Sequence, residues 1–442
     1  MKPVPDPTRP SDADLRQLLA ENVKGLAIDE TKIPDHVFRP RNTVGVFSDR
    51  GPEESKVQFA PHPPIAGIVP YHLNVSAFGT ALHNALKDSV AGYTVQLRQH
   101  SQAIFTQEWQ WAKRPQDGSE TWTPGVQLHV ASVSKLITAI AMTLLLSDNK
   151  ISPDAQIIDY LPNYWAKGPN IQFITFRNLM NHTSGLSAVD VIDFQIMKAA
   201  IATGISLDPN SANHLGKYSY QNLNFGLCRI LLPVINGNVN KSTNFPPFFN
   251  DEIWDMVTVA GYVHYAQTKV FQPAGVSDST LDHPASAGLA YKSSTDTAAG
   301  WNSGNLESVS GAAGWHLSVD DVLDVMGQFR RGGGILTPQA AQGMLDNGFG
   351  VDPFVIPPPD VPIPPGLLTP AGELYCKNGR WYDSTPNGHE EQSLAYFLPD
   401  DMELVVLANS PVASLGGLEQ FFRDVVTQVY LNNLTTQWPV HA

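Results

Sequence analysis

The stretch ASVSKLITAI, residues 131–140, places Lys135 three residues after Ser132 at the start of an apolar segment. Side chains three apart share one face of a helix, so the hydroxyl and the amine are predicted to meet in its first turn. A serine hydroxyl is a poor nucleophile at its ordinary pKa, and a neighbouring lysine held neutral in a dry site can take its proton. The unpaired N–H groups of a helix N-terminus favour the anion that forms on attack. The stretch therefore predicts a nucleophilic serine beside its own base.

The position of this Ser-x-x-Lys pattern distinguishes it from a second copy further along. Residues 132–146 are apolar almost all round, as expected of a helix that is buried on every side. The second copy, Ser147-Asp148-Asn149-Lys150, follows this apolar run, where a turn toward solvent is expected. Ser132 is therefore the candidate nucleophile.

Composition limits the classes of protein to which the chain can belong. Its 442 residues suit two interleaved domains or one large domain with insertions. The net charge of −14 argues against nucleic acid as a partner. Two cysteines, Cys228 and Cys376, cannot build a disulfide framework, and the thirteen histidines show no metal-ligand spacing. We therefore expect no metal and no cofactor.

Sequence signals for membrane insertion or export are weak. The chain has no run of 18 apolar residues, so no membrane span is expected. Residues 1–7, MKPVPDP, lack the apolar core of a signal peptide. The protein is thus expected to be cytoplasmic, or secreted or periplasmic with its leader removed. The oligomeric state does not follow from the sequence.

Two predicted β-hairpins lie far apart in the chain. Apolar and polar residues alternate from Tyr93 to Leu97, turn at His100-Ser101-Gln102 and resume at residues 104–105. A second hairpin is predicted where residues 393–397 and 403–407 flank a Pro-Asp-Asp turn. Because the two hairpins lie toward opposite ends of the chain, we expect one antiparallel sheet that both ends complete.

Helical patterns occupy most of the remaining chain. Short or amphipathic helices are predicted over residues 77–86, after the cap residue Ser318, and over residues 418–429. Residues 152 to about 300 indicate mainly helices and loops, with few strand signals. Residues 351–370 carry eight prolines and are predicted to form a loop.

These patterns predict an α/β fold of the α+β kind, an antiparallel sheet flanked by helices with an inserted all-helical domain. Residues 1–75, rich in proline and charge, are interpreted as an extension that wraps the surface. Residues 76–130 and 305–442 would form the sheet domain, and residues 131–304 the helical domain.

Two further motifs complete a recognisable set. Tyr218-Ser219-Tyr220-Gln221-Asn222 precedes an apolar helix, and Lys377-Asn378-Gly379 opens the strand region near the C-terminus. With the Ser-x-x-Lys motif, the chain resembles the serine β-lactamase and penicillin-binding-protein superfamily. The likeness is to the branch of class C β-lactamases, DD-peptidases and family VIII-type esterases, whose second motif is Tyr-x-Asn. It runs from about Ala77 to the end of the chain.

Three stretches outside the motifs resemble the same branch, in the same order. FRNLMNHTSGL at residues 176–186 is similar to a His-Thr-Ser-Gly loop, in which we expect His182 to shape the loop rather than react. VFQPAGVSDST at residues 270–280 and SGAAGWHLSVDD at residues 310–321 match two further family segments. The shared order makes a chance resemblance improbable.

The resemblance implies a role for each motif residue. Ser132 would be the acylated nucleophile, Lys135 its base or proton relay, and Tyr220 would share that work. A phenol becomes a plausible base where neighbouring cations stabilise its phenolate. No metal takes part in this scheme.

Four residues are implied to bind substrate or the oxyanion. Asn222 would orient Lys135 and the substrate carbonyl side, and Lys377 would supply positive potential. Gly379 would let the substrate approach the strand closely. The backbone N–H groups of Ser132 and Arg380 would form the oxyanion hole.

The third motif departs from the family pattern. Asn378 stands where many members have Thr or Ser, which weakens recognition of a substrate carboxylate. The chain between Lys377 and Ser393 is also longer than usual. A rival His-x-Gly motif at residues 214–216 precedes Tyr220 and is therefore out of order.

The predicted function is a serine hydrolase that works through an acyl-enzyme, with a carboxylesterase for small or aromatic esters favoured. A β-lactamase, DD-peptidase or amidase of the same fold is an alternative, as is acyl transfer to another alcohol. The partner would be a small-molecule ester, amide or β-lactam. A non-catalytic binding or assembly protein, using residues 1–75 for interaction, is the alternative from another class.

Overall fold

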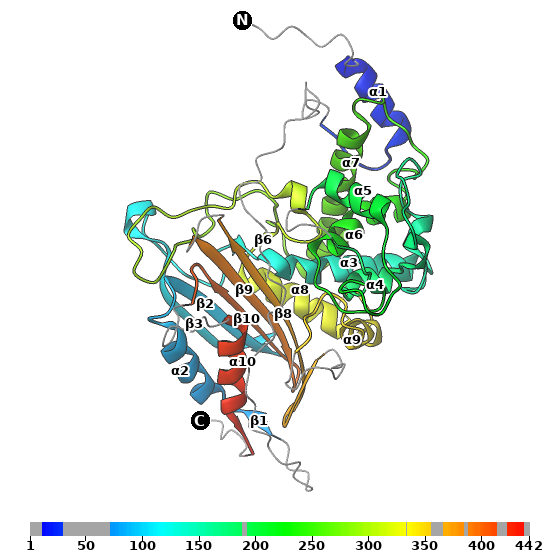
Figure 1. Ribbon diagram of the computed structural model, residues 1–442. Helices are drawn as coiled ribbons and strands as arrows, with labels where there is room; N and C mark the ends of the chain where they lie inside the picture. The colour runs from blue at the N-terminus through cyan, green and yellow to red at the C-terminus, as the bar shows by residue number, and fades with distance from the viewer. Residues whose placement is uncertain are drawn as a thin grey trace, which may run out of the picture.

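A computed structural model describes residues 11–29, 71–187, 192–332, 334–354, 366–383, 388–412 and 422–436. Figure 1 shows an antiparallel sheet with helices α2 and α10 on one face and helix α8 on the other, beside a group of helices that contains α3 to α7. The predicted mixed fold of a flanked antiparallel sheet is confirmed. The residue boundaries predicted for its domains remain a prediction.

The main sheet has seven strands in the order β4-β3-β2-β10-β9-β8-β7, and all neighbours are antiparallel. Val406 lies opposite Val95 where β10 pairs with β2, so segments from both ends of the chain meet in mid-sheet. The strands are β2 Gly92–Gln99, β3 Gln102–Lys113, β4 Glu120–Thr121, β7 Leu367–Thr369, β8 Gly372–Tyr382, β9 Glu390–Leu398 and β10 Met402–Ala408.

Both predicted hairpins are present. The first is β2 with β3, and the second is β9 with β10. The prediction of an unbroken loop over residues 351–370 is wrong at Leu367–Thr369, which form edge strand β7 and pair with the start of β8. The prolines lie mainly before this strand, so they do not remove hydrogen bonds from it. Residues 355–365 lie outside the described part of the chain.

Alternation along the strands fills two hydrophobic cores. On β10, Leu404 and Val406 face the core beneath α2 and α10, whereas Val405 and Leu407 face the larger core shared with the other helices. Helix α2 spans Val75–Leu86 and α10 spans Phe422–Asn432. The predicted helix over residues 77–86 is confirmed, and residues 418 and 421 of the predicted closing helix lie outside the described residues.

The larger core surrounds helix α3, Ser134–Asp148. Every residue from Ser134 to Met142 is buried, as the all-round apolar pattern predicts, and Ser147 of the second Ser-x-x-Lys copy is exposed. Around it lie α4 Phe176–Met180, α5 Phe194–Thr203, α6 Asn222–Ile235, α7 Asn250–Ala266, α8 Val319–Arg331 and α9 Pro338–Asp346. Helix α8 begins at the predicted cap, because Ser318 and Asp321 form a capping box.

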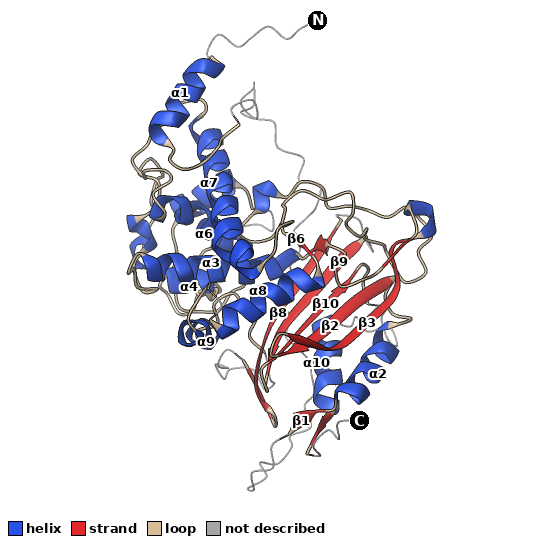
Figure 2. Ribbon diagram, turned by 180° about the vertical axis from the view of Figure 1, so that it is seen from behind, coloured by secondary structure: helices blue, strands red, loops and turns tan. Residues whose placement is uncertain are grey.

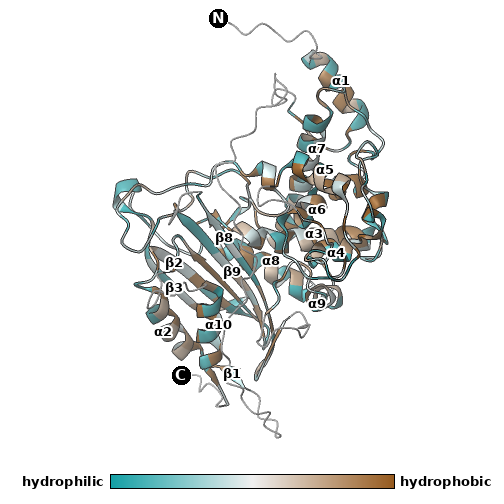
Figure 3. Cartoon of the chain, viewed as in Figure 1, coloured by the Kyte–Doolittle hydropathy of each residue, from teal (hydrophilic) through white to brown (hydrophobic). Residues whose placement is uncertain are grey.

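Two short ribbons complete the strands. Strand β1, His72–Leu73, pairs with β11, Leu434–Thr435, which joins the start of the sheet region to the end of α10. Strand β5, Leu128–His129, pairs with β6, His316–Leu317, directly before the Ser132 turn. Figure 3 shows that β8 and β9 are hydrophilic at one end, and the sequence of that end contains Arg380 and Glu390–Gln392.

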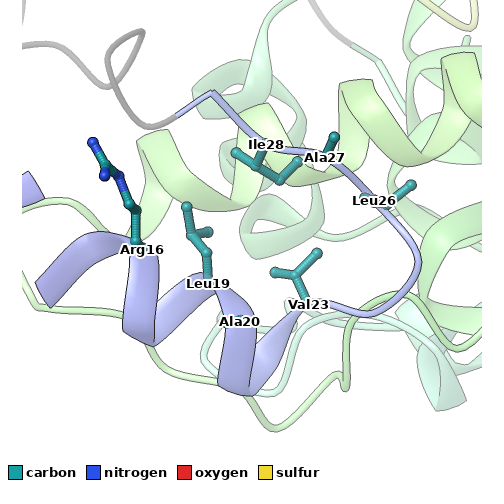
Figure 4. A pocket seen from close by; sticks show the side chains of 7 residues that line it. All are labelled: Arg16, Leu19, Ala20, Val23, Leu26, Ala27 and Ile28. Carbon is teal, nitrogen blue, oxygen red and sulfur yellow. The ribbon is translucent and has the colours of Figure 1, made fainter. Parts of the chain in front are cut away.

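The first part of the chain contains a helix that the sequence reasoning missed. Helix α1, Asp12–Asn22, starts at a capping box of Ser11 and Asp14, and Leu15 and Leu19 are buried in the larger core. A cavity of about 250 Å³ lies between α1 and the segment after it, and none of the candidate site residues lines it (Figure 4). Its lining residues are Arg16, Leu19, Ala20, Val23, Leu26, Ala27 and Ile28. Residues 30–70 lie outside the described ranges.

One segment in the described ranges, Ala131–Asp148, is long and apolar enough to cross a membrane by length and composition. Because 78% of it is buried inside the protein, it has the character of a core helix.

Candidate active site

The candidate nucleophile and base meet as the sequence predicts. A short 3-10 turn, Ala131–Val133, leads into α3 and holds Ser132 and Lys135 on one side. Lys135 Nζ donates to Ser132 Oγ at 2.6 Å and to the carbonyl oxygen of Ala312 at 2.9 Å. Both side chains are almost fully buried, so water does not compete strongly for these contacts. When the amine is neutral, its lone pair can take the serine proton across this short contact.

Tyr220 reaches the same point from a distant part of the chain. Its hydroxyl lies 2.8 Å from Ser132 Oγ, although 88 positions separate the two residues. The ammonium groups of Lys135 and Lys377 lie 5.0 Å and 4.9 Å from the centre of the Tyr220 ring. The three motifs thus converge where α3, α6 and β8 meet, at the junction of the helices and the sheet (Figures 1 and 2).

The predicted hydrogen bond between Asn222 and Lys135 is not formed. Asn222 starts α6 and is 8% exposed, and its Oδ1 has no hydrogen-bond partner in the described part of the chain. The backbone at Ala312 comes closer to Lys135 and holds the amine instead. A buried amide oxygen that accepts no hydrogen bond from the described residues is available to an N–H or O–H group of a ligand.

Lys377 has a partner that the sequence reasoning missed. Its Nζ lies 2.5 Å from Asp352 Oδ1, and both side chains are nearly fully buried. Asp352 Oδ2 accepts the backbone N–H of Asn378 at 2.8 Å. The charge of Lys377 is therefore partly compensated by Asp352 beside the site, and its role in supplying positive potential stays a prediction. Asp352 lies in a proline-rich stretch with no motif spacing, so no sequence signal marks it.

Gly379 permits a close contact within the protein itself. A Cβ atom at this position would lie 2.3 Å from Ser393 Oγ, 2.5 Å from the carbonyl oxygen of Val130 and 3.0 Å from the Ser132 nitrogen. Strand β8 therefore packs directly against the turn that carries the nucleophile. Close approach of the protein's own backbone is a further reason for the glycine, and close approach of a substrate stays a prediction.

The orientation of β8 bears on the predicted oxyanion hole. Along a strand, the N–H and C=O groups of successive residues point alternately toward one edge and the other. The carbonyl of Cys376 and the N–H of Asn378 both bond Asp352, at the edge away from β9. The N–H of Arg380 therefore faces that same edge, next to the Ser132 turn. Its guanidinium lies 2.9 Å from Glu390, so the side chain is held along the sheet.

His182 supports the ring of Tyr220. The two rings lie 4.4 Å apart at an angle of 32°, and His182 Nδ1 accepts the N–H of Gln221 at 3.2 Å. Burial, followed by the charges of Lys377 and Lys135, holds the pKa of His182 well below its usual value. A neutral imidazole in this position stacks on Tyr220 and fixes the backbone next to it, which suits the expected structural role.

A buried polar cluster lies behind the site. His129 Nδ1 lies 3.1 Å from Glu391 Oε2, and the N–H of Gly314 donates to His129 Nε2 at 3.0 Å. Burial and the charge of Lys135 lower the pKa of His129 to about 3, and burial raises the pKa of Glu391 to about 8. His129 is thus neutral with its proton on Nδ1, directed at Glu391. The cluster connects strand β9 to the Ser132 turn.

Glu391→Gln is expected to change how stability depends on pH. In the unfolded chain Glu391 loses its proton near its ordinary pKa of 4.5, but in the folded protein it keeps the proton to about pH 8. As pH rises between these two pKa values, the free energy of unfolding of the wild type therefore falls relative to that of the variant. The fall is up to about 1.4 kcal/mol per pH unit. Urea unfolding of both proteins at pH 5.5 and pH 8 measures the effect, and an equal difference at both values would contradict it.

The described residues contain no group of three or more histidine, cysteine or carboxylate side chains placed to hold a metal ion. A serine that contacts an amine and a phenol together is the arrangement of a serine hydrolase that forms an acyl-enzyme.

The β-lactamase family model matches residues 80–414, and the chain belongs to this family of serine hydrolases. The confirmed resemblance leaves the first 79 residues outside the match. No curated protein sequence matches the chain significantly.

Solved structures with the same fold share little sequence with the chain. A class C β-lactamase from Rhodobacter sphaeroides is 18% identical, with a TM-score of 0.55, and the alignment covers 81% of this chain and 99% of that one. EstCE1, a hydrolase with promiscuous acyltransferase activity, is 16% identical, with a TM-score of 0.54 and coverage of 80% and 99%. A β-lactamase/D-alanine carboxypeptidase from Pseudomonas syringae is 14% identical, with a TM-score of 0.55 and coverage of 81% and 98%. At these identities the likeness establishes the fold alone.

Proposed function

We propose that the protein is a carboxylesterase that hydrolyses small or aromatic esters through an acyl-enzyme on Ser132. The observation that carries the proposal is the pair of contacts at Ser132 Oγ, 2.6 Å from Lys135 Nζ and 2.8 Å from Tyr220 Oη. The preference for esters rests on the third motif. There Asn378 replaces the usual hydroxyl residue and Asp352 compensates Lys377, so a substrate carboxylate has little to bind.

In the proposed reaction, Ser132 Oγ attacks the ester carbonyl carbon while its proton moves to Lys135 or Tyr220. The carbonyl oxygen becomes an oxyanion that accepts hydrogen bonds from the N–H groups of Ser132 and Arg380. The C–O bond to the alcohol then breaks, and the alcohol leaves with a proton delivered by Tyr220 or Lys135. Water attacks the acyl-enzyme, gives its proton to the same pair, and releases the acid and free Ser132.

Hydrolysis of amide bonds and acyl transfer to another alcohol could use the same serine nucleophile. A β-lactam or peptide carbonyl could be attacked by the same serine, and structures with this fold include a β-lactamase and a D-alanine carboxypeptidase. EstCE1, described as a hydrolase with promiscuous acyltransferase activity, makes transfer to another alcohol a further possibility. A purely non-catalytic role is disfavoured, because such a role does not require Ser132, Lys135 and Tyr220 to remain in contact.

Assays on one preparation distinguish these functions. We expect the wild type to hydrolyse p-nitrophenyl butyrate with a higher kcat/KM than a chromogenic cephalosporin, and Ser132→Ala to hydrolyse neither. Faster turnover of the cephalosporin would refute the ester preference while keeping the serine hydrolase. Equal ester hydrolysis by wild type and Ser132→Ala would refute the assigned nucleophile.

Tyr220→Phe is expected to lower kcat for p-nitrophenyl butyrate by about 10²-fold or more, because one proton-transfer group is lost. The phenylalanine keeps the ring stacked on His182 and near both lysines, so the protein should remain folded. Tyr218→Phe is the matched control: it lies two residues away, 38% exposed, and no motif role is assigned to it. Activity of Tyr220→Phe within a factor of about three of Tyr218→Phe would exclude a proton-transfer role for Tyr220.

A further inference from the structure

Both oxygens of the Asp352 carboxylate are bound by donors of β8, as those of a bound anionic ligand would be. One oxygen lies 2.5 Å from the Lys377 ammonium, and the other accepts the Asn378 N–H at 2.8 Å. Asp352 is 3% exposed and Lys377 is 2% exposed, so the pair is shielded from water. An ammonium and a backbone N–H at a strand edge form a binding site for any carboxylate, and here the chain supplies its own.

This anion lies next to the reacting groups. Lys377 Nζ is 4.9 Å from the centre of the Tyr220 ring, and the Tyr220 hydroxyl is 2.8 Å from Ser132 Oγ. Asn378 directly precedes Gly379, whose backbone packs on the Ser132 turn. A substrate acylating Ser132 therefore has part of its structure close to the Lys377–Asp352 pair.

Asp352 is fixed in this position by its neighbours on both sides. Its own N–H donates to the carbonyl of Cys376 at 2.8 Å, which adds residue 352 to the edge of β8. Arg423 of α10 donates to the carbonyl of Pro353 at 3.4 Å, and its guanidinium lies 5.4 Å from the centre of the Phe354 ring. These contacts fix the backbone that carries the Asp352 carboxylate beside Lys377.

We propose that Asp352 is a specificity-determining residue that makes the site reject anionic substrates and select uncharged esters. An incoming carboxylate would find the Lys377 ammonium and the Asn378 N–H already occupied by the Asp352 carboxylate. Occupation of these donors disfavours the wrong ligand without adding contacts to the right one. The inference rests on the proposed esterase function and names the substrate class of the same site.

The test compares a neutral ester, p-nitrophenyl butyrate, with an anionic ester, mono-4-nitrophenyl succinate, in carboxylate-free buffer. In Asp352→Ala the ratio of kcat/KM for the anionic ester to that for the neutral ester should rise about tenfold or more above wild type. Asp251→Ala is the matched control, because Asp251 pairs with Lys198 between helices α5 and α7 and touches no site residue. Its ratio should equal that of wild type.

A binding measurement makes the test independent of catalysis. Formate should raise the melting temperature of Asp352→Ala, by filling the vacated position between Lys377 and Asn378, and should not raise that of wild type or Asp251→Ala. If Asp352→Ala does not fold, Asp352→Asn carries the same substrate-ratio test, because the amide has no charge.

The outcomes separate the two proposals. If the wild type hydrolyses neither ester but formate stabilises only Asp352→Ala, the proposed esterase function is refuted. The proposal that Asp352 occupies a carboxylate-binding position is then still supported. If the wild type hydrolyses the neutral ester, but the Asp352 variants keep the wild-type ratio and formate has no selective effect, the specificity role of Asp352 is overturned.

Discussion

Lys135→Met should lower kcat for p-nitrophenyl butyrate by about 10²- to 10⁴-fold, the range for loss of a positioned acid–base group. Lys135 Nζ is 2.6 Å from Ser132 Oγ, and it also contacts the Ala312 carbonyl and the Tyr220 ring. Methionine is similar in length but cannot accept or donate the proton. The side chain remains buried, and the folded protein loses one donor to Ala312, a cost of about 1–3 kcal/mol.

Lys150→Met is the matched control for this prediction. Lys150 belongs to the second Ser-x-x-Lys copy, directly after α3, and is exposed to solvent. Both variants remove one positive charge and leave a methionine, but only Lys135→Met removes contacts with Ser132, Ala312 and Tyr220. The role of Lys135 is refuted if its variant retains activity within tenfold of Lys150→Met while both proteins are folded.

Gly379→Ala should abolish most activity and also destabilise the protein. The new methyl group would lie 2.3 Å from Ser393 Oγ and 2.5 Å from the carbonyl oxygen of Val130, so β8 or the Ser132 turn must move. Overpacking of this kind costs about 1–3 kcal/mol. Displacement of either backbone also separates the N–H groups of Ser132 and Arg380, and the loss of one oxyanion donor lowers kcat about 10²- to 10³-fold.

Gly343→Ala serves as the control glycine. It lies inside α9, where an added Cβ would meet no atom within 4 Å. Alanine has the higher helix propensity, so this variant should be as stable as wild type or more stable, and equally active. Thermal unfolding and esterase assays of the two variants measure both effects. Unchanged activity in Gly379→Ala would mean that β8 does not form part of the catalytic site.

Local spacing explains why the central part of the site could be predicted. Ser132 and Lys135 are three residues apart in one helical turn, so their contact follows from helix geometry alone. The two hairpins likewise follow from alternation around short turns. Tyr220 and Lys377 have no local relation to Ser132, and only the resemblance to a family placed them at the same point.

The missed features depend on contacts that leave no pattern in the sequence. Asp352 reaches Lys377 only because the segment at residue 352 pairs with the edge of β8. Lys135 donates to the backbone carbonyl of Ala312. Because every residue has a backbone carbonyl, the sequence does not indicate which one a lysine will contact. The prediction therefore named Asn222, whose side chain belongs to a motif. Helix α1 did leave a signal, Ser11 followed by Asp14 and then by Leu15, Leu18 and Leu19, within a region dominated by proline and charge.

The central claim is that one hydroxyl, that of Ser132, becomes acylated. Intact-protein mass spectrometry after treatment with a fluorophosphonate, followed by peptide mapping, measures this directly. We predict a single adduct on the peptide that contains Ser132, slower labelling of Lys135→Met and no labelling of Ser132→Ala. An adduct on Ser132→Ala, or on a different residue of the wild type, would contradict the account.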